Sequence, residues 1–361
     1  MRVKLDDVCE RGSSNLKQSD IVECKDGCYP VFGASGLIGK ADFYHQEKPY
    51  VAVVKDGAGI GRALLLPAKS SAIGTMQYLL PKQNILPQYL YYVVCYMHLE
   101  KYFSGATIPH IYFRDYKNEE FNLDTIEKQA EVVETLQKVE TFIAARKQQL
   151  KKLDELVKSR FIELFGEYDL THPQESWVTI KEIGTVVGGA TPKTDHDEYW
   201  GGSYRWITPA ELEADSGYIY DSVRKLTKAG VESCSLQEMP VGTVILSSRA
   251  PIGKVAIAGK TFYCNQGFKN IICKEEIIPR YLYTILLLNV EYLNSLGRGA
   301  TFKEISKGIV ESIRIPVPPL ALQEQFAAFV EQVDKSKLVA LKYINVKNPK
   351  SDKNRRIRNE L

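Results

Sequence analysis

The residue patterns that identify most enzymes are missing from this 361-residue sequence. It contains no GxxxxGKS/T phosphate loop, no GxSxG nucleophile elbow and no HExxH zinc-binding helix. Two glycine-rich stretches, residues 33–39 and 57–61, lack the spacing and the later acidic residue of a dinucleotide site, so tight turns explain them. The Asp/Asn-Pro-Pro-aromatic segment with which adenine methyltransferases grip a flipped base is also absent. These absences predict a binding protein rather than an enzyme.

Long apolar runs, a large net charge and clustered cysteines are equally scarce. No apolar run reaches the roughly 18 residues needed to span a bilayer, and residues 282–290 fall well short. The net charge of +3 is too small to indicate a polyanionic partner by itself. No second cysteine pair or histidine cluster completes a metal site around Cys24 and Cys28. Because the sequence also starts without a signal-peptide pattern, we expect a cytoplasmic protein with reduced cysteines, no metal and no membrane contact.

An internal repeat is the strongest feature that the sequence does contain. AGIGRALLLPA (58–68) matches APIGKVAIAGK (250–260), and LPQYLYYVV (86–94) matches IPRYLYTIL (278–286) at the same offset of 192 residues. The GAT triplets at 105–107 and 299–301 follow, and then IEKQAEVVETL (126–136) matches LQEQFAAFVEQ (322–332), which sets Gln129 on Gln325. Chance matches would not keep this order, so the chain is a tandem duplication.

Residues 125–165 contain no glycine or proline and carry a heptad repeat. An apolar position recurs every seven residues in this stretch, and a second heptad row begins near Leu320. The helix-pairing positions are Leu136, Ile143, Leu150, Val157 and Leu164 in the first helix, and Phe326, Val333 and Ala340 in the second. Heptads predict helices that pair with each other. At 1.5 Å per residue the first helix is a rod of roughly 60 Å and the second, which fades near residue 344, is roughly 37 Å long.

The predicted fold class is α/β (α+β), with two tandem-repeat globular domains separated by two long helices that form an antiparallel coiled coil. Alternating apolar strands and glycine turns predict the β-rich part of each domain, and a proline-initiated helix follows in each. The predicted boundaries are 1–122 for the first domain, 123–166 for its long helix, 167–318 for the second domain and 319–345 for its helix. A basic tail over 346–361 is expected to be disordered.

Hydrogen-bonding and cationic residues occur at matching places in the loops of both copies. Arg, Lys, Asn and Gln read base edges, and Ser, Thr and Lys hold phosphates, so these loops are candidate DNA contacts. Taken singly, each residue is more simply explained as a surface or turn residue; the repeated arrangement carries the argument. The candidates are Lys55, Arg62, Ser70, Ser71, Thr75, Gln77, Thr107, His110, Tyr112 and Arg114 in the first copy, and Ser247, Ser248, Arg249, Lys254, Asn265, Gln266, Lys269, Arg298, Thr301 and Lys303 in the second.

The chain resembles the specificity subunit of type I restriction-modification systems. The resemblance rests on YPVFGASGLIGKADFY (29–44), VILSSRAPIGKVAIAGKTFYCNQGFKNI (244–271) and PPLALQEQFAAFVEQVDK (318–335), and it extends to about residue 343. It implies a non-catalytic subunit in which each globular domain is a target recognition domain for one half of a split double-stranded DNA sequence. The paired helices would set the spacer between the half-sites.

The resemblance also implies the partners and cofactors. Two methyltransferase subunits would dock on the long helices, and restriction subunits would complete the complex. S-adenosylmethionine, ATP and magnesium would belong to those subunits, with no cofactor bound by this chain. The second helix departs from the family pattern because it is shorter than the first.

Two other functions remain open on the sequence alone. One is a stand-alone DNA-modifying enzyme, which would turn over S-adenosylmethionine or cut DNA without partners. The other is a coiled-coil scaffold whose globular domains bind proteins, which would not select a bipartite DNA motif from a duplex library.

Overall fold

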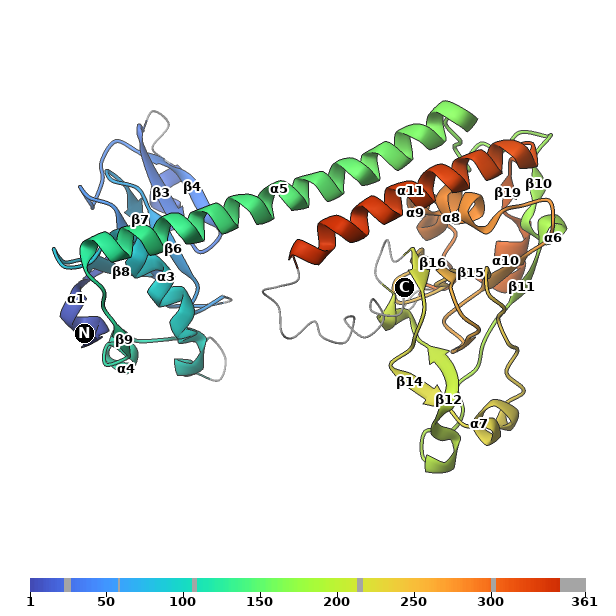
Figure 1. The fold of residues 1–361 in the computed structure, drawn as a ribbon, viewed down its shortest axis with the longest axis horizontal. Helices are drawn as coiled ribbons and strands as arrows, with labels where there is room; N and C mark the ends of the chain where they lie inside the picture. Colours follow the sequence, from blue (N-terminus) through green and yellow to red (C-terminus); the bar gives the residue numbers. More distant parts are fainter. Residues whose placement is uncertain (23–26, 58, 106–108, 213–216, 300–302, 345–361) are drawn as a thin grey trace. The chain divides into compact units, whose positions relative to one another are not determined.

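A computed structural model describes residues 1–22, 27–57, 59–105, 109–212, 217–299 and 303–344 (Figure 1). The chain forms two compact units, Met1–Ala144 (unit 1) and Ala145–Leu361 (unit 2). The division falls inside one long helix, α5 (Ile126–Phe165), rather than at either of its ends. The predicted tail over 346–361 and two candidate residues, Thr107 and Thr301, lie outside the described residues.

Unit 1 is built around a four-stranded antiparallel sheet in the order β2-β8-β5-β6. These strands are Cys9–Ser13, Met76–Pro81, Tyr50–Val54 and Ala63–Leu66. A smaller sheet joins β4 (Gly36–Ala41), β3 (Tyr29–Gly33) and β7 (Ser71–Ala72), and β1 (Arg2–Lys4) pairs with β9 (Glu120–Asn122). The helices are α1 (Leu5–Val8), α2 (Gln18–Val22), α3 (Pro87–Met97), η1 (Leu99–Tyr102) and α4 (Phe113–Tyr116).

Unit 2 repeats this plan with one more strand in its main sheet, whose order is β11-β18-β15-β16-β13. These strands are Gly184–Val187, Asn270–Cys273, Val244–Leu246, Val255–Ala258 and Tyr218–Ile219. The smaller sheet joins β14 (Arg224–Leu226), β12 (Trp200–Ile207) and β17 (Tyr263–Cys264), and β10 (Val178–Thr179) pairs with β19 (Arg314–Ile315). The helices are α6 (Ile180–Ile183), η2 (Asp197–Tyr199), η3 (Pro209–Glu211), α7 (Lys228–Ser233), α8 (Pro279–Leu288), α9 (Val290–Ser295), α10 (Lys307–Ser312) and α11 (Leu320–Ile344).

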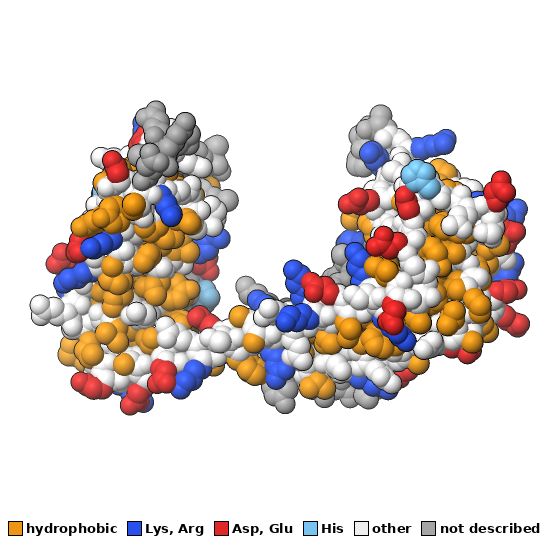
Figure 2. Space-filling view, turned by 90° about the horizontal axis from the view of Figure 1, so that it is seen from above, with side chains coloured by type: hydrophobic (Ala, Val, Ile, Leu, Met, Phe, Trp, Pro, Cys, Tyr) orange, Lys and Arg blue, Asp and Glu red, His pale blue; other side chains and the backbone are white. Residues whose placement is uncertain are grey.

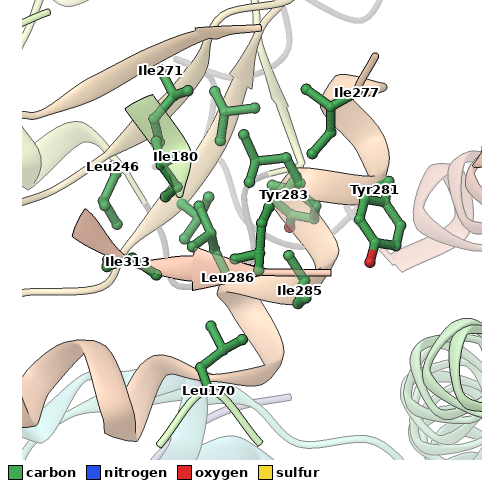
Figure 3. Packing of buried hydrophobic residues seen from close by; sticks show 14 of the residues in the cluster. Leu170, Ile180, Leu246, Ile271, Ile277, Tyr281, Tyr283, Ile285, Leu286 and Ile313 are labelled. Atoms are coloured by element: carbon green, nitrogen blue, oxygen red, sulfur yellow. The ribbon is translucent and has the colours of Figure 1, made fainter. Parts of the chain in front are cut away.

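The central strands are buried on both faces. Val51 and Val53 of β5 pack in one apolar cluster, and Tyr50, Ala52 and Val54 pack in another on the opposite face. Strand β15 does the same in unit 2, where helix α8 covers one face of the sheet (Figure 3). Burial on both faces accounts for the uninterrupted apolar runs of these strands. Each fully buried branched side chain contributes about 1.5–3 kcal/mol.

A buried glutamine joins the long helix to the rest of unit 1. The Oε1 atom of Gln129 accepts a hydrogen bond from the Leu86 N–H (2.8 Å), immediately before α3. Its Nε2 atom donates to the carbonyl oxygens of Asn84 and Asp124, both at 2.9 Å. The side chain is fully buried, so these three bonds satisfy its own amide oxygen and nitrogen.

Gln323 makes the same three bonds in unit 2 and confirms the duplication. It accepts from the Ile278 N–H (2.9 Å) and donates to the carbonyls of Glu276 (3.1 Å) and Pro318 (2.8 Å). The sequence alignment had assigned this place to Gln325, which is exposed. That assignment is wrong by two residues, and the long helices are related by an offset of 194.

The two predicted long helices are present as α5 and α11, with 40 and 25 residues. Within unit 2, α11 runs along the second half of α5 (Figure 1). Phe161 and Phe165 of α5 lie 5.4 Å and 5.7 Å, ring to ring, from Phe326 near the start of α11. Farther along, the Lys337 Nζ lies 2.5 Å from Asp154 Oδ1. The residue numbers rise on one helix as they fall on the other, so the pairing is antiparallel.

The heptad positions contribute unequally to this pairing. Phe326, Val333 and Ala340 of α11 are buried, whereas all five predicted positions of α5 are only half-buried. In the part of α5 that pairs with α11, the buried residues Phe161 and Phe165 lie outside the predicted heptad rows. They were missed because they pack on the core of unit 2 as well as on the partner helix.

Candidate nucleic-acid interface

In unit 1 the candidates converge where the turn after β5 meets the loop that ends at His110. The Ile111 N–H donates to the Lys55 carbonyl (2.9 Å), which ties the loop to the turn. The Nδ1 atom of His110 lies 2.6 Å from Oδ1 of Asp56, and the Lys55 Nζ lies 3.3 Å from Oδ2 of the same carboxylate. The fold therefore gathers a lysine, an imidazole and a carboxylate at one partly exposed place.

An exposed aromatic residue adjoins this cluster. The Tyr112 ring stacks with the His110 ring at a centroid distance of 6.4 Å, and the Arg114 guanidinium carbon lies 4.7 Å above the same tyrosine ring. Tyr112 is 47 % exposed. An aromatic face beside a cation suits base stacking and phosphate contact.

Unit 2 gathers its candidates at the corresponding junction. The Lys269 Nζ lies 3.0 Å from Oε1 of Glu304, and the Arg249 Nη1 lies 3.9 Å from Oε2 of the same carboxylate. The Lys269 Nζ also donates to Ser248 Oγ at 3.3 Å. Lysine and arginine here flank a single carboxylate, which leaves one positive charge in excess within this group.

The two junctions are built on the same backbone bonds. Ser104 and His110 exchange two bonds of 2.8 Å, and Arg298 and Glu304 exchange two bonds of 3.0 Å. The Ile305 N–H donates to the Ser248 carbonyl (3.0 Å), just as Ile111 donates to Lys55. His110 therefore corresponds to Glu304. By the same count Asp56 corresponds to Arg249, so the acidic and basic partners have changed places.

Several candidate hydroxyl groups are engaged inside the protein. Ser70 Oγ donates to the Pro67 carbonyl (2.6 Å), and Ser247 Oγ donates to the Pro251 carbonyl (2.7 Å). Ser71 Oγ accepts from the His45 N–H (2.9 Å). Ser70, Ser71, Ser247 and Ser248 are all fully buried, so in this conformation they support the loops rather than face a ligand.

Three polar candidates have similar internal roles. The Gln77 side chain is buried and donates to the carbonyls of Gly12 and Tyr78. The Lys254 Nζ donates to two carbonyls of the segment around η3, at 3.1 Å and 2.5 Å. Asn265 Oδ1 accepts from the Gly267 N–H (2.9 Å) and so closes its own turn. These hydrogen bonds to backbone groups explain why polar residues occur at these three positions.

The remaining described candidates are accessible. Gln266, Arg298 and Lys303 are exposed around the unit 2 junction, where Gln266 Oε1 accepts from Thr191 Oγ1 (2.7 Å). Arg62 is exposed in unit 1 and donates to the Ala34 carbonyl (2.6 Å). Thr75 is half-buried, and its carbonyl accepts from the Lys55 N–H (3.0 Å).

Sequence reasoning missed a second aromatic and cationic group in unit 2. The Arg224 guanidinium carbon lies 3.4 Å from the centroid of the Trp200 ring and 5.5 Å from that of Trp206. Tyr204 on the same sheet is 36 % exposed. The YRW and VRK stretches (204–206 and 223–225) were the available signal. Only the pairing of β12 with β14 brings them together.

Charges of both signs are interspersed over the surface seen in Figure 2, and they do not form a single basic patch on that face.

Burial raises the pKa of the Cys9, Cys264 and Cys273 thiols to about 12, which keeps them protonated near neutral pH. Within the described residues there is no group of three His, Cys, Asp or Glu side chains that could hold a metal ion. None of the described helices is long and apolar enough to cross a membrane.

Comparison with known proteins supplies a family and relatives. The family described as "Type I restriction modification DNA specificity domain" matches residues 1–155 and 175–347. The MjaIX specificity subunit of Methanocaldococcus jannaschii is 41 % identical over 185 residues, which are 50 % of this chain and 43 % of that protein. The EcoR124I/EcoR124II specificity subunit of Escherichia coli is 27 % identical over 168 residues, 44 % of this chain and 40 % of that one. The chain thus matches less than half of the length of either relative.

Solved structures extend the likeness to most of the chain. The S subunit of a type I restriction-modification system from M. genitalium aligns with a TM-score of 0.58 at 14 % identity, over 95 % of this chain and 91 % of that one. A chain from a study of type I R-M complex assembly aligns with a TM-score of 0.53 at 15 % identity, over 94 % and 91 %. At these identities the structures establish the fold alone. The family match over both repeats, which spans most of the sequence, shows that the chain belongs to the family of type I restriction-modification DNA specificity domains.

Proposed function

We propose that this chain is the DNA sequence-recognition subunit of a type I restriction-modification complex, with each unit reading one half of a bipartite duplex target. The observation that carries the proposal is the pair of equivalent junctions in which an acidic and a basic residue type have changed places, Asp56 with His110 in unit 1 and Arg249 with Glu304 in unit 2. A duplicated scaffold that keeps its backbone bonds and changes its polar side chains suits two different half-sites.

The side chains of the two junctions indicate different preferences for DNA bases. Arginine donates two hydrogen bonds to the O6 and N7 atoms of guanine, and lysine donates to the same edge. Carboxylates accept from the exocyclic amine of cytosine. Unit 2, with Arg249 and Lys269 flanking one carboxylate, suits a half-site that contains guanine. Unit 1 combines a carboxylate with the exposed Tyr112 ring and suits a different base composition.

The chain contributes no catalytic group in this proposal. Two methyltransferase subunits dock on the long helices and restriction subunits complete the assembly. S-adenosylmethionine, ATP and magnesium are bound by those partners. The names of the relatives, which are specificity subunits, support this division of labour.

Selection from a random duplex library tests the proposal. The chain is assembled with its methyltransferase subunits, and bound duplexes are separated by gel shift and sequenced. A motif of two short half-sites with an unspecific spacer is expected. Selection of no motif would favour a protein-binding scaffold. Methylation of DNA by the purified chain alone with S-adenosylmethionine would instead show an enzyme and contradict the proposal.

A further inference from the structure

Arg224 of unit 2 rests on a tryptophan ring and has no hydrogen bond or ion pair to another described side chain. Its guanidinium carbon lies 3.4 Å from the centroid of the Trp200 ring, and the Trp206 ring meets Trp200 edge to face at 5.1 Å. The Trp200 ring is itself fixed, because its Nε1 atom donates to the Lys193 carbonyl at 3.2 Å. Arg224 is exposed, so its N–H donors are open to solvent.

Two neighbouring cations of the same sheet are paired instead. The Arg205 Nε lies 3.4 Å and the Lys225 Nζ 3.3 Å from Oδ1 of Asp221. Side chains alternate between the two faces of a strand, so Lys225 points to the face opposite Arg224. One face of the sheet therefore carries an ion-paired group, and the other carries an arginine without a carboxylate partner among the described residues.

The duplication locates the equivalent position in unit 1. Strand β3 pairs parallel with β7 and antiparallel with β4, just as β12 pairs parallel with β17 and antiparallel with β14. The parallel-strand partners of Val31 and Trp206 are 192 residues apart, which is the offset of the repeat. The antiparallel-strand partners of the same two residues are Gly39 and Arg224. Gly39 is therefore the counterpart of Arg224.

Helix α2 covers that position in unit 1. Ile21 of α2 packs in one apolar cluster with Val31, the counterpart of Trp206. A Cβ atom at Gly39 would lie 2.5 Å from the Ile21 side chain, so any larger residue there would displace Ile21. Unit 1 thus closes this face of its smaller sheet with an apolar residue, whereas unit 2 places a cation on it.

A cover for Trp206 does not require an arginine. Trp206 is 2 % exposed, and an isoleucine covers the equivalent residue of unit 1. Stacking on an indole ring holds the guanidinium by its flat face and leaves the N–H donors, which lie in its plane, unused. Part of the entropic cost of ordering the side chain is met before any ligand arrives. Arg224 is therefore preorganised to bind an anion.

We propose that Arg224 binds a phosphate of the DNA backbone near the half-site read by unit 2, and that unit 1 makes no such contact at Gly39. This inference deepens the proposed function and rests on it. A guanidinium that rests on the surface of its own protein does not reach the floor of a major groove about 8.5 Å deep. Phosphates are the outermost groups of a duplex, and a guanidinium binds them through two parallel N–H···O bonds.

The sheet places this contact within about one turn of the duplex from the unit 2 junction. Strand β17 lies two strands from β14 and leads into the turn whose Gly267 carbonyl accepts from the Ser248 N–H at 2.8 Å. Strands about 4.8 Å apart and residues about 3.3 Å apart make the path from Arg224 to Ser248 roughly 30 Å at most. One turn of B-DNA is about 34 Å long, so we expect the phosphate within about ten base pairs of the half-site.

Substitution of Arg224 in the full-length chain, assembled with its methyltransferase subunits, tests the proposal. Arg224→Met keeps an unbranched side chain over Trp200 and removes the charge. Affinity for the selected duplex should fall about three- to tenfold at physiological salt, and the slope of log affinity against log salt should fall by about 1. The selected motif should stay the same, because phosphate contacts carry no direct sequence information.

Lys225→Met is the matched control, because Lys225 is the next residue of the same strand and points to the other face. It should leave the salt slope unchanged. Equal midpoints of urea denaturation confirm that the variants fold as the wild type does. Arg224→Gln also removes the charge and replaces Arg224→Met if the methionine lowers that midpoint.

Neutral methylphosphonate groups, placed one at a time along both DNA strands, locate the phosphate. At one position within a turn of the unit 2 half-site, wild-type affinity should fall about three- to tenfold. The Arg224→Met complex should lose nothing further at that position, because both changes remove the same contact. Around the unit 1 half-site, no position should show an effect that depends on Arg224.

Three results would overturn the inference. They are an unchanged salt slope for the Arg224 variants, an equal reduction of the slope by Lys225→Met, and an altered base preference in the selected motif, which would make Arg224 a base contact. Failure of the proposed function is seen separately. In that case the wild-type complex selects no bipartite motif, whereas failure of this inference alone leaves the motif intact and the Arg224 variants equal to the wild type.

Discussion

Units 1 and 2 share a backbone plan and differ where that plan meets the surface. In both, a loop is tied to the turn after the central strand by equivalent main-chain bonds, and a buried glutamine anchors the long helix. The side chains at the junctions have diverged until Asp56 and His110 of unit 1 correspond to Arg249 and Glu304 of unit 2. Main-chain bonds do not depend on side-chain identity. The scaffold therefore tolerates a change of recognition chemistry that would disrupt a site built from side chains alone.

The second difference between the units is at the long helices. The surface formed by α8 and α11 is covered by aromatic residues of α5, whereas the corresponding surface of α3 and α5 forms a groove. The same backbone arrangement therefore forms a closed core in unit 2, whereas in unit 1 it forms an apolar wall beside the exposed Tyr96. The predictions below test which of these differences matter, from the largest effect to the smallest.

Removal of one covering ring should have the largest effect. Phe161→Ala is expected to lower the free energy of unfolding of unit 2 by about 3–5 kcal/mol, because it empties a site enclosed by Tyr281 and Phe326. Phe142→Ala on the same helix is the control; Phe142 is 42 % exposed, and we expect a change of about 0.5 kcal/mol or less. Urea denaturation measures both. Similar losses for the two variants would show that Phe161 does not cover a core.

Gln323→Ala should destabilise unit 2 by about 2–4 kcal/mol, since it leaves the Ile278 N–H and two carbonyls without partners inside the protein. Gln325→Ala is the matched control, because that residue is exposed two positions along the same helix. Gln129→Ala should destabilise unit 1 comparably. A larger effect at position 325 than at 323 would contradict the register inferred here.

Arg249→Ala should weaken binding by tenfold to a hundredfold, about 1–3 kcal/mol, on duplexes with an intact unit 2 half-site. With that half-site scrambled, wild-type and variant complexes should bind equally. His110→Ala should show the reverse dependence on the half-sites. Quantitative gel shifts on four duplexes measure the pattern, and equal losses on all four would make Arg249 a phosphate contact or a structural residue.

The smallest expected effects compare Lys303, which is exposed, with Lys254, whose ammonium group is hydrogen-bonded inside the protein. Lys303→Ala should reduce the slope of log affinity against log salt by about 1, because an exposed cation releases a counterion when it meets a phosphate. Lys254→Ala should leave that slope unchanged and destabilise the fold by about 1 kcal/mol, since its Nζ is bonded to two carbonyls. An altered slope for Lys254→Ala would show that it reaches DNA.

The sequence was most informative where structure is local. The heptad rows and the absence of glycine and proline located both long helices to within a few residues. The repeat predicted two domains of one plan, because collinear matches of 80 residues require a common backbone. Two of the candidates, Lys55 and His110, lie together around Asp56 in unit 1, and three others, Ser248, Arg249 and Lys269, lie together in unit 2.

What the sequence could not predict depends on contacts between distant segments. Ser70 and Ser71 look like phosphate ligands in a one-dimensional pattern, yet both side chains are buried. The aromatic pair Phe161 and Phe165 fell outside the heptad because it packs on a core that forms from residues 120 positions later. The carboxylates of Asp56 and Glu304 were also missed, since neither residue type reads as a DNA ligand on charge alone.

Burial of β5 and β15 on both faces has a consequence for hydrogen exchange. Amide hydrogens in a strand that is bonded on both edges and covered on both faces exchange mainly when the whole cooperative unit opens. Val51 to Val53 and Val244 to Leu246 therefore act as separate reporters for units 1 and 2. Peptides that contain them would give two opening free energies from one intact chain and reveal which copy unfolds first.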